Sequence, residues 1–369
     1  MDAALNTFGE VRSIAQGEPT ANQWKKLCRM LEAWEDPTSL EQVVLPYLMG
    51  ALSRWPDDLR VAPEHWVARQ LGGEDIPALL VTRKLVLRSM WFGAAARVSE
   101  ALTHSPGFAN CVILQIQAGT GASELVAMLD ADESWLTRIK SLRFFNVDLG
   151  DELAQTLVAS KNLARLEELR LDYTKLTGVT LEAIAKAPLA ASLKSLGLQQ
   201  IDLSASHALL ENLEKLPKLE SLELRSAELA VSHLDELSAL RPPENLRSLS
   251  LRDNRARDQG VRALARGRFG ANLKGLVLSN NQIGTAGARA IAESEQSSSL
   301  EVLDLQMNRL DTDAAMELAR TPFLKNLREL KLDLNLIGVQ GWRALMESKH
   351  LRDVVKAALE PLAKEAEDF

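Results

Sequence analysis

The residue types that most often carry catalysis or bind metal ions are sparse in this chain. Its five histidines lie at positions 65, 104, 207, 233 and 350, and its only cysteines are Cys28 and Cys111. The histidines do not fall at metal-ligand spacing, and the chain has no Gly-x-x-x-x-Gly-Lys, His-Glu-x-x-His, Cys-x-x-Cys or Gly-x-Ser-x-Gly motif. We therefore expect no cofactor, no metal site and no enzymatic activity.

Two segments could still bind an anion. Gly119-Thr-Gly121 lacks the third glycine or the lysine of a phosphate-binding loop and falls where a turn is expected, so we interpret it as structural. Segment 241–268 holds eight arginines against three acidic residues. Its simpler interpretation is a solvated face; the alternative is an acidic partner or a phosphate contacted by Arg255 and Arg257 in a turn.

The element that must position any functional side chain is a phrase that recurs every 26 or 27 residues, from Ile139 to Ile337. It reads Leu-x-x-Leu-x-Leu and is followed by a short turn. Eight copies are clear, and they start at Ile139, Leu166, Leu193, Leu219, Leu246, Leu273, Leu300 and Leu327. Two weaker copies lie at Phe108–Ile116 and Thr82–Leu87. A period of this size predicts a solenoid, which binds through an extended surface.

Each copy predicts one short strand followed by one helix. The second and third leucines are two residues apart, so they point to one face of a strand. The residues that follow repeat at helical spacing, as in Leu234, Leu237 and Leu240. Strands stack at about 4.8 Å whereas helices are roughly 10 Å across, so the strand side should be the concave side.

These copies, together with helical segments such as Gln259–Ala265, resemble the leucine-rich repeat family. The repeats are most similar to those of ribonuclease inhibitor and the Ran GTPase-activating protein. The resemblance covers roughly residues 80 to 340. It implies an α/β leucine-rich repeat solenoid, a horseshoe with parallel strands on its concave face and helices on its convex face.

The turn after each strand divides the array into two halves. In this family an asparagine normally bonds to backbone inside the turn, and the last four repeats carry Asn254, Asn281, Asn308 and Asn335. The equivalent upstream residues are Val147, Thr174, Ile201 and Ala227. Three of these four cannot form hydrogen bonds through the side chain, so we expect more irregular turns upstream.

We expect three segments: an α-helical N-terminal cap at 1–79, the solenoid at 80–340 with about ten repeats, of which the first two are degenerate, and a capping helix with an acidic tail at 341–369. The cap should contain helices at Ala3–Gln16, Ala21–Trp34, Leu40–Ser53 and Pro63–Gln70, and Ser39 with Gln42 matches a capping box. Gly341–Ala366 should close the array, followed by a solvated tail that contains Glu365, Glu367 and Asp368.

Five of the seven tryptophans lie in the cap or beside the first weak repeat, at positions 24, 34, 55, 66 and 91. They fill the core of the cap in the simpler interpretation. The alternative is that some of them form an exposed aromatic docking patch.

The strand register predicts which side chains face a partner on the concave surface. They are Arg143, Phe145, Arg170, Asp172, Tyr173, Gln199, Glu223, Arg225, Arg252, Asp253, Asn280, Asp304, Gln306, Met307 and Asp333. Phe145, Tyr173, Met307 and Leu334 are the candidate anchors, because large side chains dominate binding energies. The simpler interpretation is that each is an ordinary exposed apolar residue.

We therefore expect a non-enzymatic scaffold or regulator that binds another protein. The alternative, suggested by the resemblance, is a GTPase-activating or GTPase-regulating protein that acts through turn arginines. A formal net charge of −7 argues against general nucleic-acid binding. The N-terminus shows no signal peptide, no segment is apolar enough to span a membrane, and two distant cysteines fit a cytoplasmic setting.

Overall fold

The computed structural model describes residues 2–88, 91, 95–119, 122–130, 134–204, 210–267 and 270–367. Thr120 and Gly121 of the glycine pair, His207, Arg268 and Asp368 lie outside this range. The chain divides into two compact units. The first comprises Met1–Asp148 and Ser160–Leu166, and the second comprises Leu149–Ala159 and Glu167–Phe369. The boundaries expected at 79/80 and 340/341 stay predictions.

The first unit begins with a helical segment. Its helices are α1 (Asp2–Gln16), α2 (Ala21–Glu32), α3 (Pro37–Ser39), α4 (Leu45–Ala51) and α5 (Glu64–Leu71). A π-helical turn at Leu40–Val44 and 3-10 turns at Leu52–Arg54, Asp57–Leu59 and Pro77–Val81 connect them. Thr20 starts α2, because its side-chain oxygen accepts a hydrogen bond from the Gln23 N–H at 3.2 Å.

The capping box predicted at Ser39 is wrong. Helix α3 begins two residues earlier, where Asp36 Oδ1 accepts a hydrogen bond from the Thr38 N–H at 3.1 Å. Pro37 occupies the first helical position, where its fixed φ is favourable and its missing N–H costs nothing. Ser39 Oγ instead accepts a hydrogen bond from Trp34 Nε1 at 2.9 Å. The single helix expected at 40–53 is consequently three successive helical turns of different type.

Three of the five N-terminal tryptophans form part of the core of the first unit. Trp24, Trp55 and Trp66 are at most 4 % exposed. The indole N–H groups of Trp24 and Trp55 donate to backbone carbonyls at 2.8 and 3.1 Å, so burial leaves no polar atom unsatisfied there. The core interpretation is confirmed for these three, while Trp34 and Trp91 are partly exposed.

The first unit also holds three parallel strands, β1 (Lys84–Arg88), β2 (Ile113–Gly119) and β3 (Ser141–Val147). They alternate with α6 (Ala95–His104), α7 (Ala122–Asp130) and 3-10 turns at Pro106–Phe108, Ser134–Arg138 and Lys161–Leu163. Leu85 pairs with Leu114, and Leu114 pairs with Leu142. This is the register expected for the two weak copies of the phrase.

The second unit contains seven parallel strands in chain order. They are β4 (Glu168–Asp172), β5 (Ser195–Gln199), β6 (Ser221–Arg225), β7 (Ser248–Ser250), β8 (Gly275–Val277), β9 (Val302–Asp304) and β10 (Glu329–Lys331). The helices are α8 (Gly150–Ala159), α9 (Gly178–Lys186), α10 (Val231–Ala239), α11 (Arg257–Arg266), α12 (Thr285–Glu293), α13 (Thr312–Arg320), α14 (Val339–Met346) and α15 (Asp353–Glu367). Short 3-10 turns at Pro188–Ala191, Leu210–Lys215, Glu295–Ser299 and Pro322–Leu324 complete the repeats.

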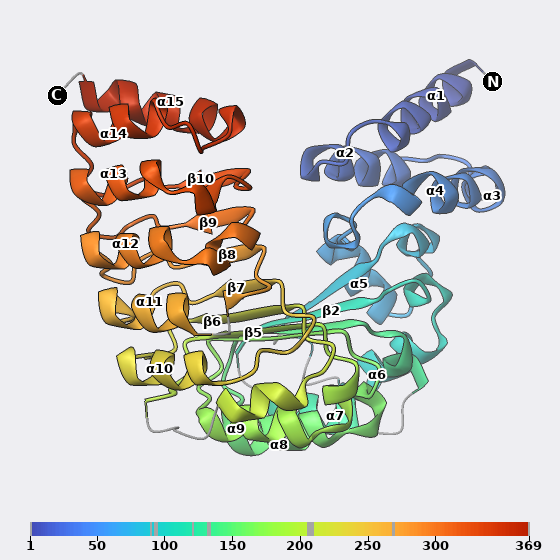
Figure 1. Cartoon of the computed structure of the whole chain (residues 1–369). Helices are drawn as coiled ribbons and strands as arrows, with labels where there is room; N and C mark the ends of the chain where they lie inside the picture. The colour runs from blue at the N-terminus through green and yellow to red at the C-terminus, as the bar shows by residue number, and fades with distance from the viewer. Residues whose placement is uncertain are drawn as a thin grey trace. The chain divides into compact units, whose positions relative to one another are not determined.

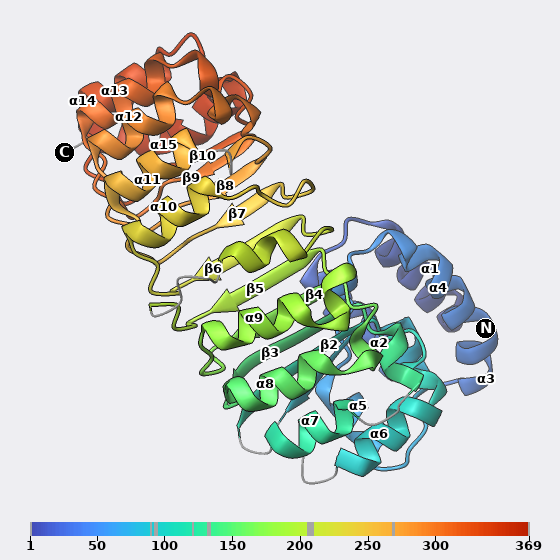
Figure 2. The same ribbon diagram turned by 60° about the horizontal axis from the view of Figure 1, so that its bottom comes forward.

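The leucines of the phrase form the core between sheet and helices. In β5, Leu196 and Leu198 are at most 1 % exposed, and their register partners Leu222 and Leu224 in β6 are fully buried. Figure 1 shows α10 to α14 in succession along one side of β7 to β10, and Figure 2 shows α9 against the sheet of β4 to β6. This is the α/β solenoid expected from the repeats, with one face of the sheet covered by helices.

The single closing helix predicted at Gly341–Ala366 is wrong, because the structure has two helices there, α14 and α15. Between them Ser348 Oγ accepts hydrogen bonds from the N–H groups of His350 and Leu351, both at 3.2 Å. The same hydroxyl donates to the Ala319 carbonyl at 2.5 Å. A serine that bonds to local backbone competes with the helical pattern, so α14 ends and the chain turns before α15 begins.

The turns after the strands share one feature in all eight clear repeats. A residue in the left-handed region follows each strand, namely Asn146, Tyr173, Gln200, Ser226, Asp253, Asn280, Met307 and Leu334. In the second unit its N–H donates to the next repeat, as from Gln200 to the Arg225 carbonyl at 2.9 Å and from Met307 to the Asp333 carbonyl at 2.9 Å. The upstream turns are therefore as regular as the others at this position, and the expectation of irregular turns is wrong.

The asparagine ladder is confirmed in the last four repeats. Fully buried Asn281 accepts from the Ala256 N–H at 3.1 Å and donates to the carbonyls of Leu251 and Leu278 at 2.8 and 3.1 Å. Each asparagine thus ties its own turn to the preceding repeat. Upstream, where asparagine is absent, the equivalent side chains of Val147, Thr174, Ile201 and Ala227 are at most 2 % exposed and fill the space by apolar packing.

Candidate protein-binding surface

The face of the second unit's sheet that the helices leave uncovered is its candidate functional surface, and we call it the open face. Along β4 the side chains alternate between buried and half-buried, so Glu168, Arg170 and Asp172 lie on the open face. The same parity in the following strands produces rows of side chains that run across the sheet. The predicted residues of this unit lie in these rows or at the left-handed turn positions.

An ion pair bridges three strands at one end of the open face. Arg170 in β4 donates from Nη1 to Glu223 Oε2 in β6 at 2.8 Å and passes over Gly197 in the intervening strand. A Cβ atom added at Gly197 would lie 3.1 Å from the guanidinium carbon, which is why glycine suits this position. Burial opposes the charge of Arg170, but its hydrogen bond to Glu223 and the nearby Asp172 carboxylate raise its pKa.

The environment disfavours the charged form of Asp172, whereas it favours that of Arg170. Its side chain is 14 % exposed, and burial raises its pKa although Arg170 lies 3.4 Å away. Among the described residues, Asp172 Oδ1 is buried and has no hydrogen-bond partner, so this carboxylate keeps an unused acceptor.

A second network links β6 to the turns of the next two repeats. Arg225 Nε lies 2.7 Å from Asp253 Oδ2, and Arg252 Nε lies 3.5 Å from the same oxygen. Asn280 Nδ2 donates to Asp253 Oδ1 at 3.0 Å. Burial opposes ionisation of Asp253, yet the bonds from Asn280 and Arg225 lower its pKa, so this carboxylate holds three other predicted residues together.

Two predicted residues do not present their side chains to solvent. Gln199 is 7 % exposed and donates from Nε2 to the Tyr173 hydroxyl at 2.6 Å, so tyrosine covers it. Asp304 is 6 % exposed and accepts from the Gln306 N–H at 3.0 Å, while Gln306 Nε2 donates to Asp333 Oδ2 at 2.6 Å. Gln199 and Asp304 therefore position neighbours and do not themselves face a partner.

Exposed large side chains follow the left-handed turn position. Tyr173 is 38 % exposed, Met307 is 42 % exposed and Leu334 is 75 % exposed. Met307 and Leu334 belong to consecutive repeats, and Leu336, two residues further, is 73 % exposed. Bulky residues in the left-handed region carry a steric cost of about 1 kcal/mol or more, and Leu334 gains little burial in return.

Three segments of the chain, residues 243–265, 271–292 and 296–319, match the model of the family described as Leucine Rich repeat. The chain carries leucine-rich repeats. A search of the curated proteins finds no match.

Comparison with solved structures gives matches of low sequence identity. An internalin from Listeria monocytogenes is 18 % identical, with 74 % of this chain and 67 % of that chain covered and a TM-score of 0.41. A Bacteroides fragilis protein is 15 % identical, with coverage of 74 % and 82 % and a TM-score of 0.47. The yeast Rad7 and Elc1 complex contains a chain that is 16 % identical, with coverage of 89 % and 90 % and a TM-score of 0.47.

In the first unit, the strand face is partly occupied by the helical cap. Arg143 in β3 donates to both oxygens of Asp58 at 2.5 and 2.9 Å, and Lys84 in β1 lies 3.0 Å from Asp58 Oδ1. The hydrogen bond from Arg143 is the main cause that lowers the pKa of Asp58 to about 2. Arg143, predicted to face a partner, is therefore held by the chain itself, whereas Phe145 in the same strand is 45 % exposed.

Sequence reasoning missed two residues at these surfaces. Leu336 could have been found, because the equivalent positions in the three preceding leucine-rich repeats are Arg255, Gln282 and Arg309, and only here is the residue apolar. Asp58 carried no signal, since it reaches Arg143 across 85 residues of sequence.

The arginine-rich segment does not act as one surface. Arg247 donates to the carbonyls of Glu244 and Leu246, and Arg255 lies 3.2 Å from Glu228. Their charges are therefore engaged by neighbours within the leucine-rich repeats. Arg262 and Arg266 of α11 are exposed.

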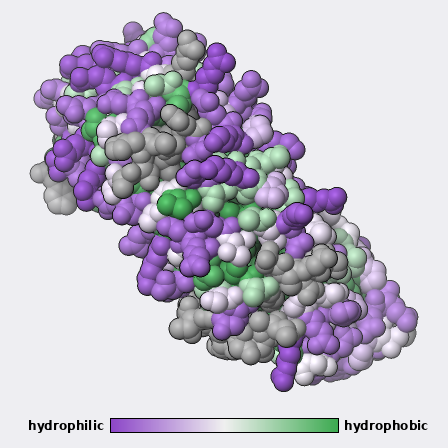
Figure 3. Space-filling model, turned by 90° about the horizontal axis from the view of Figure 1, so that it is seen from below, coloured by the Kyte–Doolittle hydropathy of each residue, from purple (hydrophilic) through white to green (hydrophobic). Residues whose placement is uncertain are grey.

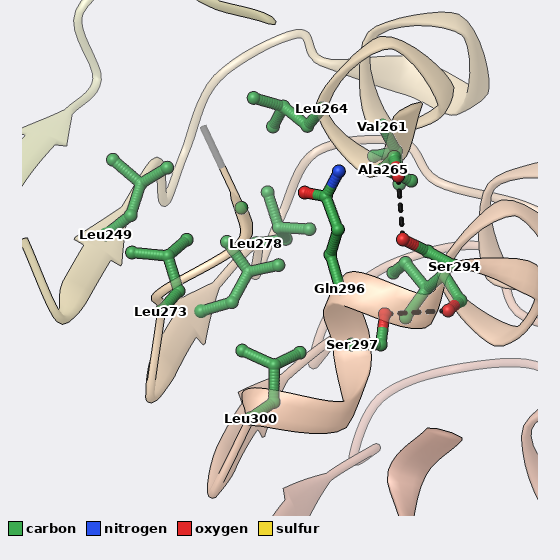
Figure 4. A pocket seen from close by; sticks show the side chains of 13 residues that line it. Leu249, Val261, Leu264, Ala265, Leu273, Leu278, Ser294, Gln296, Ser297 and Leu300 are labelled. Carbon is green, nitrogen blue, oxygen red and sulfur yellow. Dashed lines mark hydrogen bonds between the residues drawn. The ribbon is translucent and has the colours of Figure 1, made fainter. Parts of the chain in front are cut away.

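A narrow cavity of about 30 Å³ lies inside the leucine-rich repeats beneath α11 (Figure 4). Apolar side chains, mainly leucines, line most of it, and Gln296 extends into it from the 3-10 turn after α12. The volume suits one or two water molecules and is far too small for a metabolite.

Both cysteines are buried, burial raises the pKa of each thiol to about 12, and neither is poised as a nucleophile.

Among the described residues, no three His, Cys, Asp or Glu side chains gather as metal ligands. No helix in the described part of the chain is long and apolar enough to cross a bilayer. Figure 3 shows one side of the molecule on which hydrophilic residues predominate and hydrophobic ones occur in small groups.

Proposed function

We propose that this protein is a non-enzymatic scaffold or regulator whose open face binds another protein. The observation that carries the proposal is the exposure of Tyr173, Met307 and Leu334 at turn positions that cost backbone strain. Folding alone does not account for Met307 and Leu334, because glycine or asparagine would fit the left-handed turn with less strain. A protein partner that buries them would recover their apolar surface.

The charged networks beside these side chains suit the rim of such an interface. The Arg170–Glu223 pair and the Asp253 cluster hold their side chains in fixed positions before a partner arrives, which lowers the entropy lost on binding. Mixed charge also favours one orientation of the partner over others. A cytoplasmic location belongs to the proposal and is supported by the two buried free thiols.

GTPase regulation gains no specific support. An arginine that acts in trans must reach out to the nucleotide, but Arg255 is paired with Glu228. One proposed function therefore stands.

Site-specific cross-linking tests the proposal. A photoreactive amino acid is placed at Met307 or Leu334 on the open face, or at Val179, which is 49 % exposed in α9 and serves as the matched control. In lysate of the source cells, we expect one discrete cross-linked protein from the open-face positions and none from Val179. Equal products from all three positions, or none from the open face, would contradict the proposal.

A further inference from the structure

The turn after β10 is more apolar than the turns of the three preceding repeats, and we call residues 334–339 the end turn. Leu334 and Leu336 are mostly exposed, and Val339 at the start of α14 is 36 % exposed. The nine equivalent residues upstream are Asp253, Asn280, Met307, Arg255, Gln282, Arg309, Asp258, Thr285 and Thr312. Only one of these nine is apolar, so the last repeat alone presents an apolar turn to its surroundings.

The backbone of the end turn lacks a partner that the earlier turns have. The Asn280 N–H donates to the Gln306 carbonyl at 3.0 Å, and the Met307 N–H donates to the Asp333 carbonyl at 2.9 Å, in each case in the next repeat. Among the described residues, the equivalent N–H of Leu334 has no acceptor. The end turn therefore keeps an unused donor on the side where a further repeat would lie.

The asparagine ladder also ends here. Asn335 Oδ1 accepts from the N–H groups of Asn308 and Leu310, both at 3.1 Å, but within the described part of the chain nothing accepts from the Asn335 N–H. The Leu310 carbonyl accepts from the Leu336 N–H at 2.8 Å, whereas the equivalent Ile337 carbonyl has no donor among the described residues. The end turn thus offers two backbone donors and one acceptor along one edge.

Helix α15 packs on the apolar core at this end of the second unit and leaves the end turn uncovered. In Figure 1, α15 lies beside α14 at the end of the array. Val355 and Leu359 of α15 are at most 1 % exposed, so the helix packs through these side chains, while Leu336 stays exposed. The cap of the first unit, in contrast, bonds to the edge strand β1, since the Ala62 N–H donates to the Lys84 carbonyl at 2.8 Å.

The end turn and the residues that follow it carry no charge. From Leu334 to Trp342 the sequence contains no Asp, Glu, Lys, Arg or His. Because the chain as a whole has a formal net charge of −7, two copies repel each other unless the surfaces that meet are locally uncharged. The end turn is such a surface, and it is apolar as well.

We propose that the end turn is a contact between two copies of this chain, related by a two-fold axis that passes through it. A two-fold axis places the same surface of each copy opposite itself. Leu336 and Val339 of one copy then cover those of the other. The unpaired N–H groups of Leu334 and Asn335 meet the unpaired Ile337 carbonyl of the second copy, so the set of backbone groups is self-complementary. The proposal does not depend on a partner at the open face.

Sedimentation velocity on the full chain measures the self-association between about 1 and about 100 μM. The test variant is L336E/V339E, which places like charges opposite each other across the axis; Leu334 borders the open face and is left unchanged. The matched control is V43E/V179E, which alters two valines that are about half exposed in the Leu40–Val44 turn and in α9. Each variant replaces two exposed apolar residues and changes the formal net charge from −7 to −9. Circular dichroism melts check that both remain folded.

We expect the wild-type chain to dimerise reversibly as its concentration rises. L336E/V339E should raise the dissociation constant at least about tenfold, and V43E/V179E less than about twofold. A wild-type chain that stays monomeric at every concentration would overturn the proposal, because a second copy would then not be the occupant. Equal weakening by both variants would overturn it too, because net charge alone would then explain the loss.

Charge exchange at Leu336 tests the two-fold axis itself. L336E and L336K should each dimerise weakly, because like charges meet across the axis. An equimolar mixture should dimerise at least about tenfold more tightly than either variant alone, because opposite charges then meet. A mixture that associates no better than its components would contradict the arrangement.

Discussion

Replacing Asn281 with alanine tests the asparagine ladder most severely. The residue is fully buried, and its side chain serves four backbone groups: it accepts from the Ala256 N–H at 3.1 Å and donates to the carbonyls of Leu251, Leu278 and Ser279 at 2.8 to 3.1 Å. Because repeats contact mainly their neighbours, a lost link of this kind weakens the coupling between two successive units.

The expected loss of stability follows from the backbone groups that Asn281→Ala leaves without a hydrogen-bond partner. The Ala256 N–H loses its side-chain acceptor, and a buried unsatisfied donor costs about 1–3 kcal/mol. The Leu251 carbonyl keeps its bond from Asn254 Nδ2 at 2.8 Å, so its loss is smaller. The carbonyls of Leu278 and Ser279, which also lose a donor, and the small cavity left by the side chain add to this cost. We therefore expect Asn281→Ala to lower the free energy of unfolding by about 3–4 kcal/mol.

Urea unfolding followed by far-ultraviolet circular dichroism measures this change. The control is Asn280→Ala, because Asn280 is exposed; loss of its bond to Asp253 at 3.0 Å and the strain of alanine in the left-handed region should together cost about 1–2 kcal/mol. Hydrogen exchange at the Ala256 amide should accelerate only in the Asn281 variant. Equal destabilisation by the two variants, or an Ala256 amide that stays protected, would refute the reasoning.

Three further predictions concern stability. Asp58→Asn should destabilise the first unit by about 1 kcal/mol at pH 7 after allowance for solvent screening, as judged by urea unfolding against an Asp75→Asn control. Because the folded pKa of Asp58, about 2, lies below its unfolded value, the difference is present above about pH 5 and disappears as the pH falls toward 2. Gly287→Ala should lower the melting temperature, since the added Cβ would lie 2.5 Å from an Ile283 methyl group, at a cost of about 2 kcal/mol. A Cβ atom added at Gly50 in α4 meets nothing within 4 Å. Gly50→Ala should therefore raise the melting temperature, by the equivalent of about 0.5–1 kcal/mol of stability.

The repeat register was predictable because apolar spacing is a local property of the chain. Leucines two residues apart must share one face of a strand, which predicted the pairing of Leu114 with Leu142 even where the phrase is degraded. The ladder asparagines were predictable for the same reason, since each lies at a fixed offset from the strand. The helix start at Asp36 was also predictable, because Asp-Pro is common at the start of a helix. The capping pattern at Ser39 led to the wrong residue instead.

The features that escaped prediction depend on contacts between distant residues. Arg143 was assigned to a partner, but Asp58 of the cap binds it. Gln199 lies on the open face as expected, and only the position of the Tyr173 ring, which extends over it, determines that it is buried. Regular upstream turns arise from backbone bonds between repeats, which side-chain identity does not reveal.

The affinity of the cross-linked partner for variants of the open face tests the central claim most directly. Isothermal titration compares the wild-type chain with M307A/L334A on the open face and with V179A/V354A on helices α9 and α15, where both valines are about half exposed. We predict that M307A/L334A weakens binding at least about tenfold and that V179A/V354A changes it less than about twofold. Unchanged affinity of M307A/L334A, or equal weakening by both variants, would contradict the assignment of the open face as the binding surface.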